Sequence, residues 1–377
     1  MKKSAKPISL TLTSPFVLNA FLLGHIERLS RIFSVSVYVN RKESDIPILL
    51  AQGARLYHVE IRRNISPWHD LKALCCLWHQ YRKNKIAAAV SVTPKGGLLG
   101  ITAAALAGVP IRIHWFTGQV WASKQGIARW LLKRIDQCMA LMATHLLADS
   151  ASQRAFLIKE GITRANKIQV LGNGSISGVD TKRFQPNEEA RTRVRSSLGI
   201  NQTDFCFIYV GRMKREKGTS DLLEAFSSLS QKHSNIHLLL VGPDEEHLLD
   251  DSLPSNIHSV GFTKEVEDYM AAGDVFCLPS YREGFGSVLI EAAAVGLPAV
   301  ASRIYGITDA VVEGETGLLH QPGNIAELTK CLSDLLNNPL KCRELGTNGS
   351  QRANEKFSRE SIEDLFSHFL RDCLQKA

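Results

Sequence analysis

No stretch of this sequence is long and apolar enough to span a bilayer. The longest apolar run without a charged residue covers positions 98–111, whereas a membrane-spanning helix needs about 20 such residues. Near the N-terminus, lysines precede an apolar stretch, but Thr11, Thr13 and Asn19 interrupt it. We therefore expect a strand, a loop and a helix there, and no signal peptide.

Cysteine motifs for metal or redox chemistry are also missing. The eight cysteines include no Cys-x-x-Cys pair, which argues against a zinc knuckle or a dithiol redox site. Cys206 and Cys277 lie in apolar segments. We expect them to be buried, reduced thiols of a cytoplasmic protein.

The two halves of the chain differ strongly in charge. The 377 residues are 44% apolar and 22% charged, which is typical of a globular protein, and the length favours two domains. Residues 1–170 carry 24 Lys and Arg against 8 Asp and Glu, whereas residues 171–377 carry 21 against 29. The basic half is predicted to meet an anionic surface or acceptor. The alternative is that the charge serves solubility alone.

Short apolar runs alternate with helical patterns along the chain. In the first half, strands are predicted at residues 8–13, 35–39, 55–60, 87–92, 111–114 and 145–148, and helices at 17–33, 68–82, 97–107 and 127–143. In the second half, strands are predicted at 205–210, 237–241, 274–278 and 298–301. Such alternation indicates parallel sheets covered by helices on both faces.

The alternation occurs twice, and a polar stretch near residues 172–202 separates the two series. We place the domain boundary in this stretch, with a first domain at 1–175 and a second at 176–355. The predicted fold class is α/β, with two doubly wound, Rossmann-like domains that face a central cleft. Ligands of such folds bind at the carboxyl ends of the strands.

Two cations follow the apolar strand at residues 205–210. Arg212 comes directly after Gly211, and Lys217 precedes Gly218 and a helical pattern. Fixed cations between a strand end and a helix suit a diphosphate, whose negative charge persists in the leaving group. The prediction of a diphosphate site depends on this position, because lysines are common elsewhere on protein surfaces.

A second motif reads Glu283-Gly-Phe-Gly-Ser-Val-Leu-Ile-Glu291. Its glutamates flank the entrance of a predicted helix at 287–295, and a carboxylate can accept two hydroxyls of a sugar or ribose. Gly284 and Gly286 let backbone N–H groups approach a phosphate at the helix N-terminus. The alternative is an ordinary helix with an acidic first turn, but apolar residues and glycines between the glutamates argue against it.

With the surrounding sequence, these motifs resemble the family-4 glycosyltransferases of the retaining, two-domain GT-B fold, of the bacterial surface-polysaccharide type. The resemblance covers most of the chain and is best from residues 205 to 320, including Gly314-Glu-Thr-Gly-Leu-Leu319. It implies that domain 1–175 binds the acceptor and domain 176–355 the nucleotide-sugar. It also implies that residues 356–377 cross back onto the first domain.

The resemblance implies roles for single residues. Glu283 would contact the donor sugar and act in catalysis, Glu291 would contact the nucleotide ribose, and Arg212 and Lys217 would hold the diphosphate. Strand-end loops around the base add two positions. The full set of predicted donor-binding residues is Arg212, Lys217, Gly284, Phe285, Gly286, Glu291, Gly242 and Phe262.

The end of the strand at 111–114 is the predicted acceptor side. His114 precedes Thr117-Gly118, as in relatives whose histidine contacts the donor sugar, and we predict a catalytic role for it; a structural histidine is the alternative. Aromatic and apolar residues beside a basic segment predict an interfacial surface, with a buried loop as the alternative. These residues are Trp115, Phe116, Val120, Trp121, Arg129, Lys133 and Arg134, with Arg62 and Arg63 as further cations.

Two features depart from common patterns. The family often has a Gly-Gly pair in the first strand-to-helix loop, whereas this chain has Ser14-Pro15-Phe16-Val17-Leu18-Asn19. The chain also lacks any Asp-x-Asp pair, the usual metal-dependent motif of nucleotide-sugar enzymes. We therefore expect no metal and no cofactor, and cations that stabilise the departing diphosphate.

Together these features predict a retaining, metal-independent glycosyltransferase. It would move a hexosyl or N-acetylhexosaminyl group from a nucleotide-sugar, expected to be a UDP-sugar, to a lipid-linked saccharide. We expect it on an anionic membrane surface, at the cytoplasmic face of the inner membrane, without a nucleic-acid partner. Two alternatives stay open: a UDP-sugar 2-epimerase of the same fold, and a non-enzymatic, basic nucleic-acid-binding protein that would lack any recognised motif.

Overall fold

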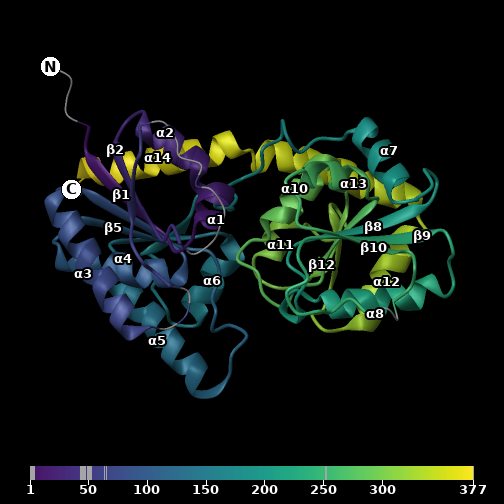
Figure 1. The fold of residues 1–377 in the computed structure, drawn as a ribbon, viewed down its shortest axis with the longest axis horizontal. Coiled ribbons are helices and arrows are strands. Elements are labelled where there is room, and N and C mark those ends of the chain that lie inside the picture. The colour runs from purple at the N-terminus through teal and green to yellow at the C-terminus, as the bar shows by residue number, and fades with distance from the viewer. Residues whose placement is uncertain are drawn as a thin grey trace. The chain divides into compact units, whose positions relative to one another are not determined.

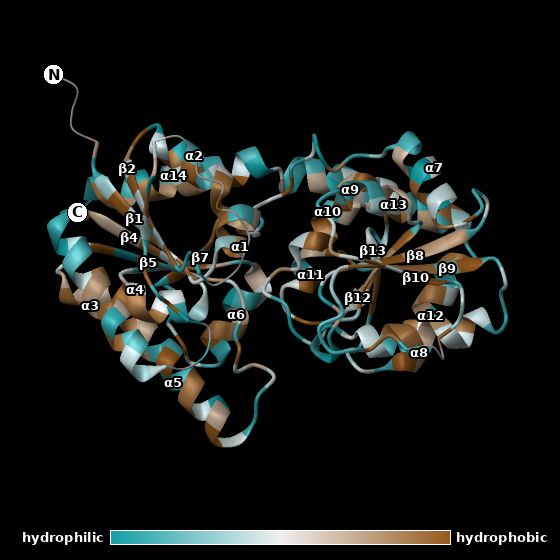
Figure 2. Ribbon diagram, viewed as in Figure 1, coloured by the Kyte–Doolittle hydropathy of each residue, from teal (hydrophilic) through white to brown (hydrophobic). Residues whose placement is uncertain are grey.

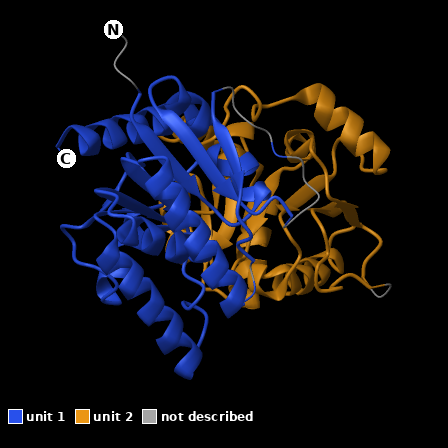
Figure 3. Ribbon diagram, turned by 60° about the vertical axis from the view of Figure 1, so that its left-hand side comes forward, with its two compact units in different colours: residues 1–177, 359–377 blue, residues 178–358 orange. Residues whose placement is uncertain are grey.

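The chain divides into two compact units in its computed structural model, which describes residues 5–42, 48, 53–62, 64, 66–250 and 253–376. Unit 1 comprises Met1–Ser177 and Arg359–Ala377, and unit 2 comprises Gly178–Ser358 (Figure 1, Figure 3). Each unit contains its own parallel sheet with helices on both faces. No helix of the described residues has the length and apolar character needed to cross a bilayer.

The described part of unit 1 forms a seven-stranded parallel sheet in the order β3-β2-β1-β4-β5-β6-β7. The strands are β1 (Pro7–Thr11), β2 (Ser34–Val39), β3 (Arg55–His58), β4 (Ala88–Val92), β5 (Ile111–Phe116), β6 (His145–Ala148) and β7 (Ile168–Val170). The central strands are apolar and buried on both faces, as a covered parallel sheet requires. The strand order reverses between β1 and β4.

Two layers of helices cover this sheet. The helices of unit 1 are α1 (Pro15–Val17), the π-helical turn η1 (Leu18–Leu22), α2 (Leu23–Ser30), α3 (Pro67–Lys83), α4 (Pro94–Leu106), α5 (Gly126–Met142), α6 (Ala151–Lys159) and α14 (Arg359–Lys376). Helix α14 packs beside α2, and its Phe366 and Leu370 join the core formed by β1 and β2 (Figure 1). On the other face, α4 lies between α3 and α5.

The described part of unit 2 forms a six-stranded parallel sheet in the order β10-β9-β8-β11-β12-β13. The strands are β8 (Phe205–Val210), β9 (Ile236–Val241), β10 (Ile257–Gly261), β11 (Val275–Leu278), β12 (Ala299–Ser302) and β13 (Gly317–His320). The helical segments are α7 (Glu188–Ser197), η2 (Arg215–Lys217), α8 (Thr219–Ser230), α9 (Val266–Ala271), α10 (Ser287–Val295), α11 (Ile307–Ala310), α12 (Ile325–Leu336) and α13 (Pro339–Lys356). Here the strand order reverses between β8 and β11.

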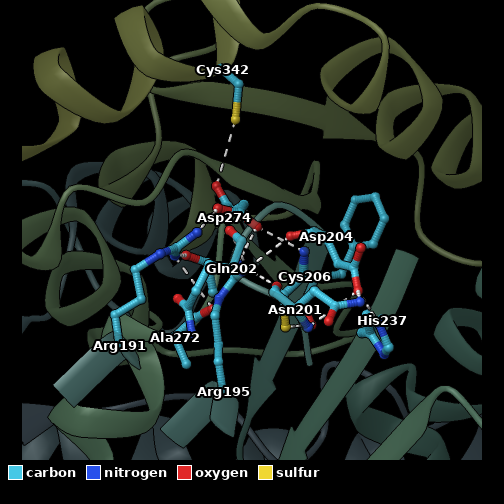
Figure 4. A network of polar contacts seen from close by, with 12 residues as sticks. Arg191, Arg195, Asn201, Gln202, Asp204, Cys206, His237, Ala272, Asp274 and Cys342 are labelled. Carbon is cyan, nitrogen blue, oxygen red and sulfur yellow. Dashed lines mark hydrogen bonds and ion pairs between the residues drawn. The ribbon is translucent and has the colours of Figure 1, made fainter. Parts of the chain in front are cut away.

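A buried ion-pair network joins the amino ends of β8 and β11 (Figure 4). The fully buried Arg195 of α7 donates to Asp274 Oδ2 at 2.7 Å and to the carbonyls of Ala272, Asn201, Gln202 and Asp204. The same Asp274 oxygen accepts the backbone N–H of Cys206 in β8 at 2.7 Å. The network therefore aligns the two strands whose opposite ends carry the predicted donor loops.

The predicted doubly wound α/β class is confirmed, and the named strands lie within a few residues of their predicted positions. Three strands were missed: β7, β10 and β13. All three are edge strands. β7 has only three residues, β10 is largely half-exposed, and β13 has two apolar residues between Gly317 and His320, so none shows a continuous apolar run.

Candidate active site

The candidate donor site lies in unit 2, where the strand order reverses between β8 and β11. Loops that leave the carboxyl ends of two such strands form the ligand site of doubly wound sheets. The loop after β8 contains Arg212 and Lys217, and the loop after β11 contains Glu283. The structure therefore brings the two predicted motifs together, although more than 60 residues separate them in the sequence.

Gly218 positions the first loop against the second. It has φ of 70°, in the left-handed region, and precedes α8. A Cβ atom at this position would lie 2.0 Å from the carbonyl oxygen of Pro279. Only glycine satisfies both the dihedral angle and the close approach, so this residue brings Lys217 beside the β11 loop.

Ion pairs then link the two loops. Lys217 Nζ lies 2.6 Å from Glu283 Oε1, which also accepts the Ser280 hydroxyl at 2.9 Å. Next to this pair, Arg282 Nε donates to Glu216 Oε1 at 2.5 Å. The side chains of Lys217 and Glu283 are 23% and 14% exposed. The predicted diphosphate cation and the predicted sugar-binding carboxylate thus neutralise each other in this arrangement.

Arg212 belongs to a second, more open cluster. Its side chain is 51% exposed and lies 3.4 Å from Glu245 Oε2, in the loop after β9. Lys214 Nζ lies 2.5 Å from the same oxygen. Lys214 was not among the predicted site residues, although it sits in the same loop as Arg212 and Lys217. With Arg215, the strand-end loop therefore contains four cations rather than two.

The Gly-Phe-Gly turn presents backbone rather than side chains. Phe285 is buried in contact with Phe357, with ring centres 5.4 Å apart, so only its main chain is available to a ligand. Gly286 has φ of 76° and is the N-cap residue directly before α10. A Cβ atom on Gly306 would lie 2.3 Å from the carbonyl oxygen of Gly284, so the loop after β12 packs closely against the turn.

Glu291 lies inside α10, in a different setting from Glu283. It is half-buried and interacts electrostatically with Arg183, which ion-pairs with Glu267 at 2.7 Å. Glu283, by contrast, sits in the loop before the helix. The two carboxylates therefore differ in position and in partner, and their assigned roles stay predictions.

The two predicted base-contacting residues differ in character. Gly242 has φ of 137°, and a Cβ atom there would lie 2.0 Å from the carbonyl oxygen of Gly211, so the strand ends of β8 and β9 pack through it. Its N–H donates to Gly261. Phe262, directly after β10, is 67% exposed. An exposed aromatic ring at a strand end is a suitable surface for stacking a nucleotide base.

In unit 1, His114 is a packed residue of β5. It is 2% exposed, Nδ1 lies 2.9 Å from the Ser91 hydroxyl, and burial lowers its pKa to about 3. A Cβ atom on Gly97 would lie 2.4 Å from His114 Cε1, so α4 rests directly on the ring. This setting favours the structural alternative for His114, and its contact with a donor sugar stays a prediction.

The point of reversal in unit 1 is lined by hydroxyl groups. Thr13, after β1, and Thr93, after β4, approach to 2.6 Å between their Oγ1 atoms. Thr93 has φ of 73°, which is uncommon for a β-branched residue. Such strain often marks functional positions. The Ser14 side chain is buried, and its hydroxyl has no hydrogen-bond partner among the described residues.

The predicted interfacial surface after β5 is wrong for its aromatic residues, whereas Val120 is 39% exposed. Trp115, Phe116 and Trp121 are at most 3% exposed and belong to the core. Arg129 and Lys133 both pair with Glu160 at 2.8 Å and cover the Trp121 ring, so their charges are partly neutralised. An amphipathic pattern does not say which face is buried, and here the protein core takes the aromatic residues. Arg62 pairs with Glu60, and Arg63 lies outside the described residues.

Comparison with known proteins identifies the family. Residues 190–352 match the family "Glycosyl transferases group 1", and residues 27–174 match the "Glycosyl transferase 4-like domain". The chain is 31% identical over 356 residues to the capsular polysaccharide biosynthesis glycosyltransferase CapM of Staphylococcus aureus, covering 89% of this chain and 93% of that relative. The chain belongs to the family-4 glycosyltransferases.

A second relative matches a smaller part of this chain. This family-4 glycosyltransferase is 29% identical over 254 residues to the Escherichia coli UDP-Gal:alpha-D-GlcNAc-diphosphoundecaprenol alpha-1,3-galactosyltransferase, with 65% of each chain covered. Solved structures agree on the fold. The sucrose-phosphate synthase of Thermosynechococcus elongatus matches with a TM-score of 0.83 at 22% identity, over 99% of this chain and all of that chain.

The Anabaena protein HepE, in complex with UDP and glucose, matches with a TM-score of 0.80 at 19% identity, over 98% of this chain and 100% of that chain. The predicted GT-B fold is therefore confirmed. In the described residues, no group of three or more His, Cys, Asp or Glu side chains is placed to hold a metal ion.

Proposed function

We propose that this glycosyltransferase moves a sugar from a UDP-sugar to a lipid-linked saccharide, with retention of configuration, in the synthesis of a surface polysaccharide. The observation that carries the proposal is the contact of Lys217 with Glu283 where the strand order of unit 2 reverses. A diphosphate cation and a hydroxyl-binding carboxylate lie side by side there. This is the pair of functions that the junction between the phosphate and the sugar of a nucleotide-sugar needs.

The choice of donor and acceptor draws on the relatives. HepE was solved in complex with UDP and glucose, and the name of the E. coli relative specifies UDP-Gal and a diphosphoundecaprenol acceptor. CapM is named for capsular polysaccharide biosynthesis. These names support a UDP-sugar donor and a lipid-linked acceptor for this chain. We also propose a peripheral place for it at the cytoplasmic face of the membrane that holds such an acceptor.

Unit 2 is the proposed donor-binding part. Lys217 and Arg212 would bind the diphosphate together with the N-terminus of α10, where Gly284 and Gly286 permit close approach. Glu283 would bind the donor sugar and Glu291 the ribose. Phe262, with its 67% exposed ring, would stack on the base near Gly242.

Unit 1 is the proposed acceptor-binding part, with Thr13 and Thr93 at its point of strand-order reversal. In the proposed reaction the bond between the anomeric carbon and the diphosphate oxygen breaks. An acceptor hydroxyl forms the new bond on the same face of the sugar, and its proton passes to the departing diphosphate. Lys217 and Arg212 would stabilise the charge that develops on that leaving group, the largest electrostatic requirement of the reaction.

The test is transfer of radiolabelled sugar from UDP-sugars to lipid-linked acceptors, followed by determination of the anomeric configuration of the product. Glu283→Ala should abolish most transfer while bare UDP still binds, whereas Glu291→Ala should weaken UDP binding in calorimetric titration. The reverse pattern would exchange the two roles.

Incubation with donor alone separates the proposed function from its rivals. A UDP-sugar 2-epimerase would produce an isomer of the donor without any acceptor. Binding to DNA without an effect of nucleotide-sugar would instead favour the nucleic-acid-binding alternative.

A further inference from the structure

Helix α3 presents an apolar stripe to solvent. Trp68, Leu71, Cys75 and Trp78 recur every three or four residues, and their exposed fractions reach 76% at Trp68 and 51% at Leu71. This spacing places them on one face of a helix. The opposite face packs into the core through Ala73, Leu77 and Tyr81. The stripe is therefore additional to what the core requires.

Helix α5 repeats the arrangement. Ile127, Trp130, Leu131 and Leu141 are 84%, 58%, 50% and 77% exposed. Its buried face uses other residues, including Met139 and Ala140. Figure 2 shows hydrophobic turns among hydrophilic ones on both α3 and α5. Two helices on the same side of the sheet thus each expose large apolar side chains, with α4 packed between them.

Both helices also carry a tryptophan covered by an arginine four residues later. The Arg82 guanidinium carbon lies 5.6 Å from the centre of the Trp78 ring, and that of Arg134 lies 5.7 Å from Trp130. Such cation–π pairs keep a charge at the rim of an apolar surface. They place a cation next to an exposed aromatic ring, the combination that suits the headgroup level of a bilayer.

Charge on this side of unit 1 is strongly one-sided. Helices α3, α4 and α5 carry seven Lys or Arg and two Asp. Three of the cations, Lys95, Arg129 and Lys133, pair with carboxylates. In the described part of the chain, the other four have no carboxylate partner: Lys72, Arg82, Lys83 and Arg134. Both aspartates are occupied: Asp70 pairs with Lys95 at 2.7 Å, and Asp136 is buried and accepts the Trp121 indole N–H at 2.7 Å. An anionic partner would therefore meet no free carboxylate on these helices.

The placement of the stripes follows from the topology. Each helix follows a strand, α3 after β3 and α5 after β5, and runs back along a parallel sheet. The first turns of both helices therefore lie at the carboxyl end of the sheet. Trp68 and Leu71 lie in the first turns of α3, as Ile127 and Trp130 do in those of α5. The apolar residues thus extend to the end of the sheet where Thr13 and Thr93 lie.

We propose that the docking face, defined by Trp68, Leu71, Trp78, Ile127, Trp130 and Leu131 with Arg82 and Arg134, binds the surface of an anionic lipid bilayer. This proposal rests on the proposed function, because a lipid-linked acceptor is presented at such a surface. Aliphatic side chains and tryptophans enter the headgroup region, while the arginines meet acidic lipid. It replaces the predicted surface after β5, whose aromatic residues are buried.

Tryptophan fluorescence supplies a direct test with the intact chain. Trp68, Trp78 and Trp130 are exposed, whereas the other two tryptophans, Trp115 and Trp121, are buried. Vesicles that contain phosphatidylglycerol and brominated phosphatidylcholine should quench the emission at low salt. Vesicles of phosphatidylcholine alone should bind far less, and salt should weaken binding.

Substitutions locate the face. The double variant Trp68→Ala, Trp130→Ala should lower the vesicle partition coefficient at least about tenfold, because two exposed rings lose their apolar contact. Arg82→Glu with Arg134→Glu should lower it by at least as much at low salt. The matched control is Leu340→Ala, since Leu340 is 78% exposed on α13 of unit 2 and should bind as the unchanged protein does.

The outcomes separate this proposal from the proposed function. The docking face would be overturned if both double variants bound vesicles as the unchanged protein does. It would also be overturned if the protein formed a concentration-dependent dimer, and did not bind lipid, and the tryptophan substitutions abolished that dimer. Preference for DNA over acidic vesicles would also overturn it. UDP binding by thermal shift and transfer to a short-chain, water-soluble acceptor should persist in the variants. Failure of those two assays in the unchanged protein would count against the proposed function alone.

Discussion

Lys217 and Glu283 form an ion pair, with 2.6 Å between Nζ and Oε1, across two loops that follow β8 and β11. Both residues were predicted to contact the donor, one at the diphosphate and the other at the sugar. Their pairing means that a donor must compete with Glu283 for the lysine. Both charges of this partly buried pair have already lost part of their hydration. Replacing Glu283 by a phosphate as the partner of Lys217 therefore costs less free energy than leaving the ammonium without a partner would.

Glu283→Gln should strengthen binding of bare UDP while it lowers transfer. The amide keeps the shape but frees Lys217 from its negative partner, and we expect UDP to bind up to about tenfold more tightly, roughly 1.4 kcal/mol. Calorimetric titration measures this affinity. Weaker UDP binding in Glu283→Gln would show that the carboxylate organises the phosphate site and does not compete with phosphate for Lys217.

Lys217→Ala should weaken UDP binding more than Arg212→Ala does. Lys217 is 23% exposed and fixed between two loops, whereas Arg212 is 51% exposed. Loss of a charge-assisted contact to a buried phosphate costs about 1.5–3 kcal/mol. Arg193→Ala is the control, because Arg193 has a 63% exposed side chain, pairs with Asp268 of α9 and belongs to neither of these loops, so its loss should leave affinity and turnover unchanged. Equal, small losses in all three variants would remove the diphosphate assignment.

Transfer should survive EDTA. The sequence contains no Asp-x-Asp pair, and Lys217, Arg212 and the N-terminus of α10 are available to stabilise the leaving diphosphate. Initial rates with and without chelator measure this. An activity that EDTA abolishes and added magnesium or manganese restores would contradict the prediction.

Arg195→Met should destabilise unit 2 strongly. The arginine is fully buried and satisfies four carbonyls and Asp274, so its removal leaves buried acceptors without donors. The expected loss is about 3–5 kcal/mol, measured by urea unfolding. The neighbouring Arg191 also pairs with Asp274, but it is 21% exposed, so Arg191→Met should cost less. An equal cost for both would show that burial is not what makes Arg195 important.

The stability of unit 1 should fall as the pH rises from 6.5 to 8. Burial raises the pKa of Asp149 to about 8, above its value of about 3.9 in an unfolded chain, so the folded state holds its proton longer and loses stability as the pH rises. Burial lowers the pKa of His25 to about 4 and that of His114 to about 3, and these groups cost stability only below about pH 6.5. Burial also raises the pKa of Asp136, to about 6, so most of its effect lies below this window and Asp149 dominates above pH 6.5.

Asp149→Asn should flatten this dependence, because the amide resembles the protonated acid and cannot ionise. Thermal unfolding at pH 6.5, 7.25 and 8 measures the slope in both proteins. A slope that is the same in both proteins would assign the pH effect to another group.

Local patterns were enough to predict the fold class and the donor motifs. Buried strands of a parallel sheet are continuous apolar runs, so β8, β9 and β11 were visible in the sequence, and motifs at their ends had to meet at one edge of the sheet. The meeting of Lys217 with Glu283 follows from that topology. The edge strands β7, β10 and β13 lacked the signal because β7 has only three residues, β10 is largely half-exposed, and β13 has only two apolar residues between Gly317 and His320.

Only the tertiary structure decided which side chains are available. His114, Phe285 and Trp121 are residue types that bind sugars, and each lies near the end of a strand, but all three are buried in contact with other elements. Helices α3 and α5 show the opposite case, in which apolar side chains stay exposed. The pattern of each helix is compatible with two buried faces, and packing against the sheet and α4 selects one of them. Whether a side chain is buried depends on contacts between residues far apart in the chain. Composition and periodicity are local properties and do not specify those contacts. The residue types of the donor motifs could therefore be predicted from local sequence, whereas the exposure of each side chain was decided by tertiary packing.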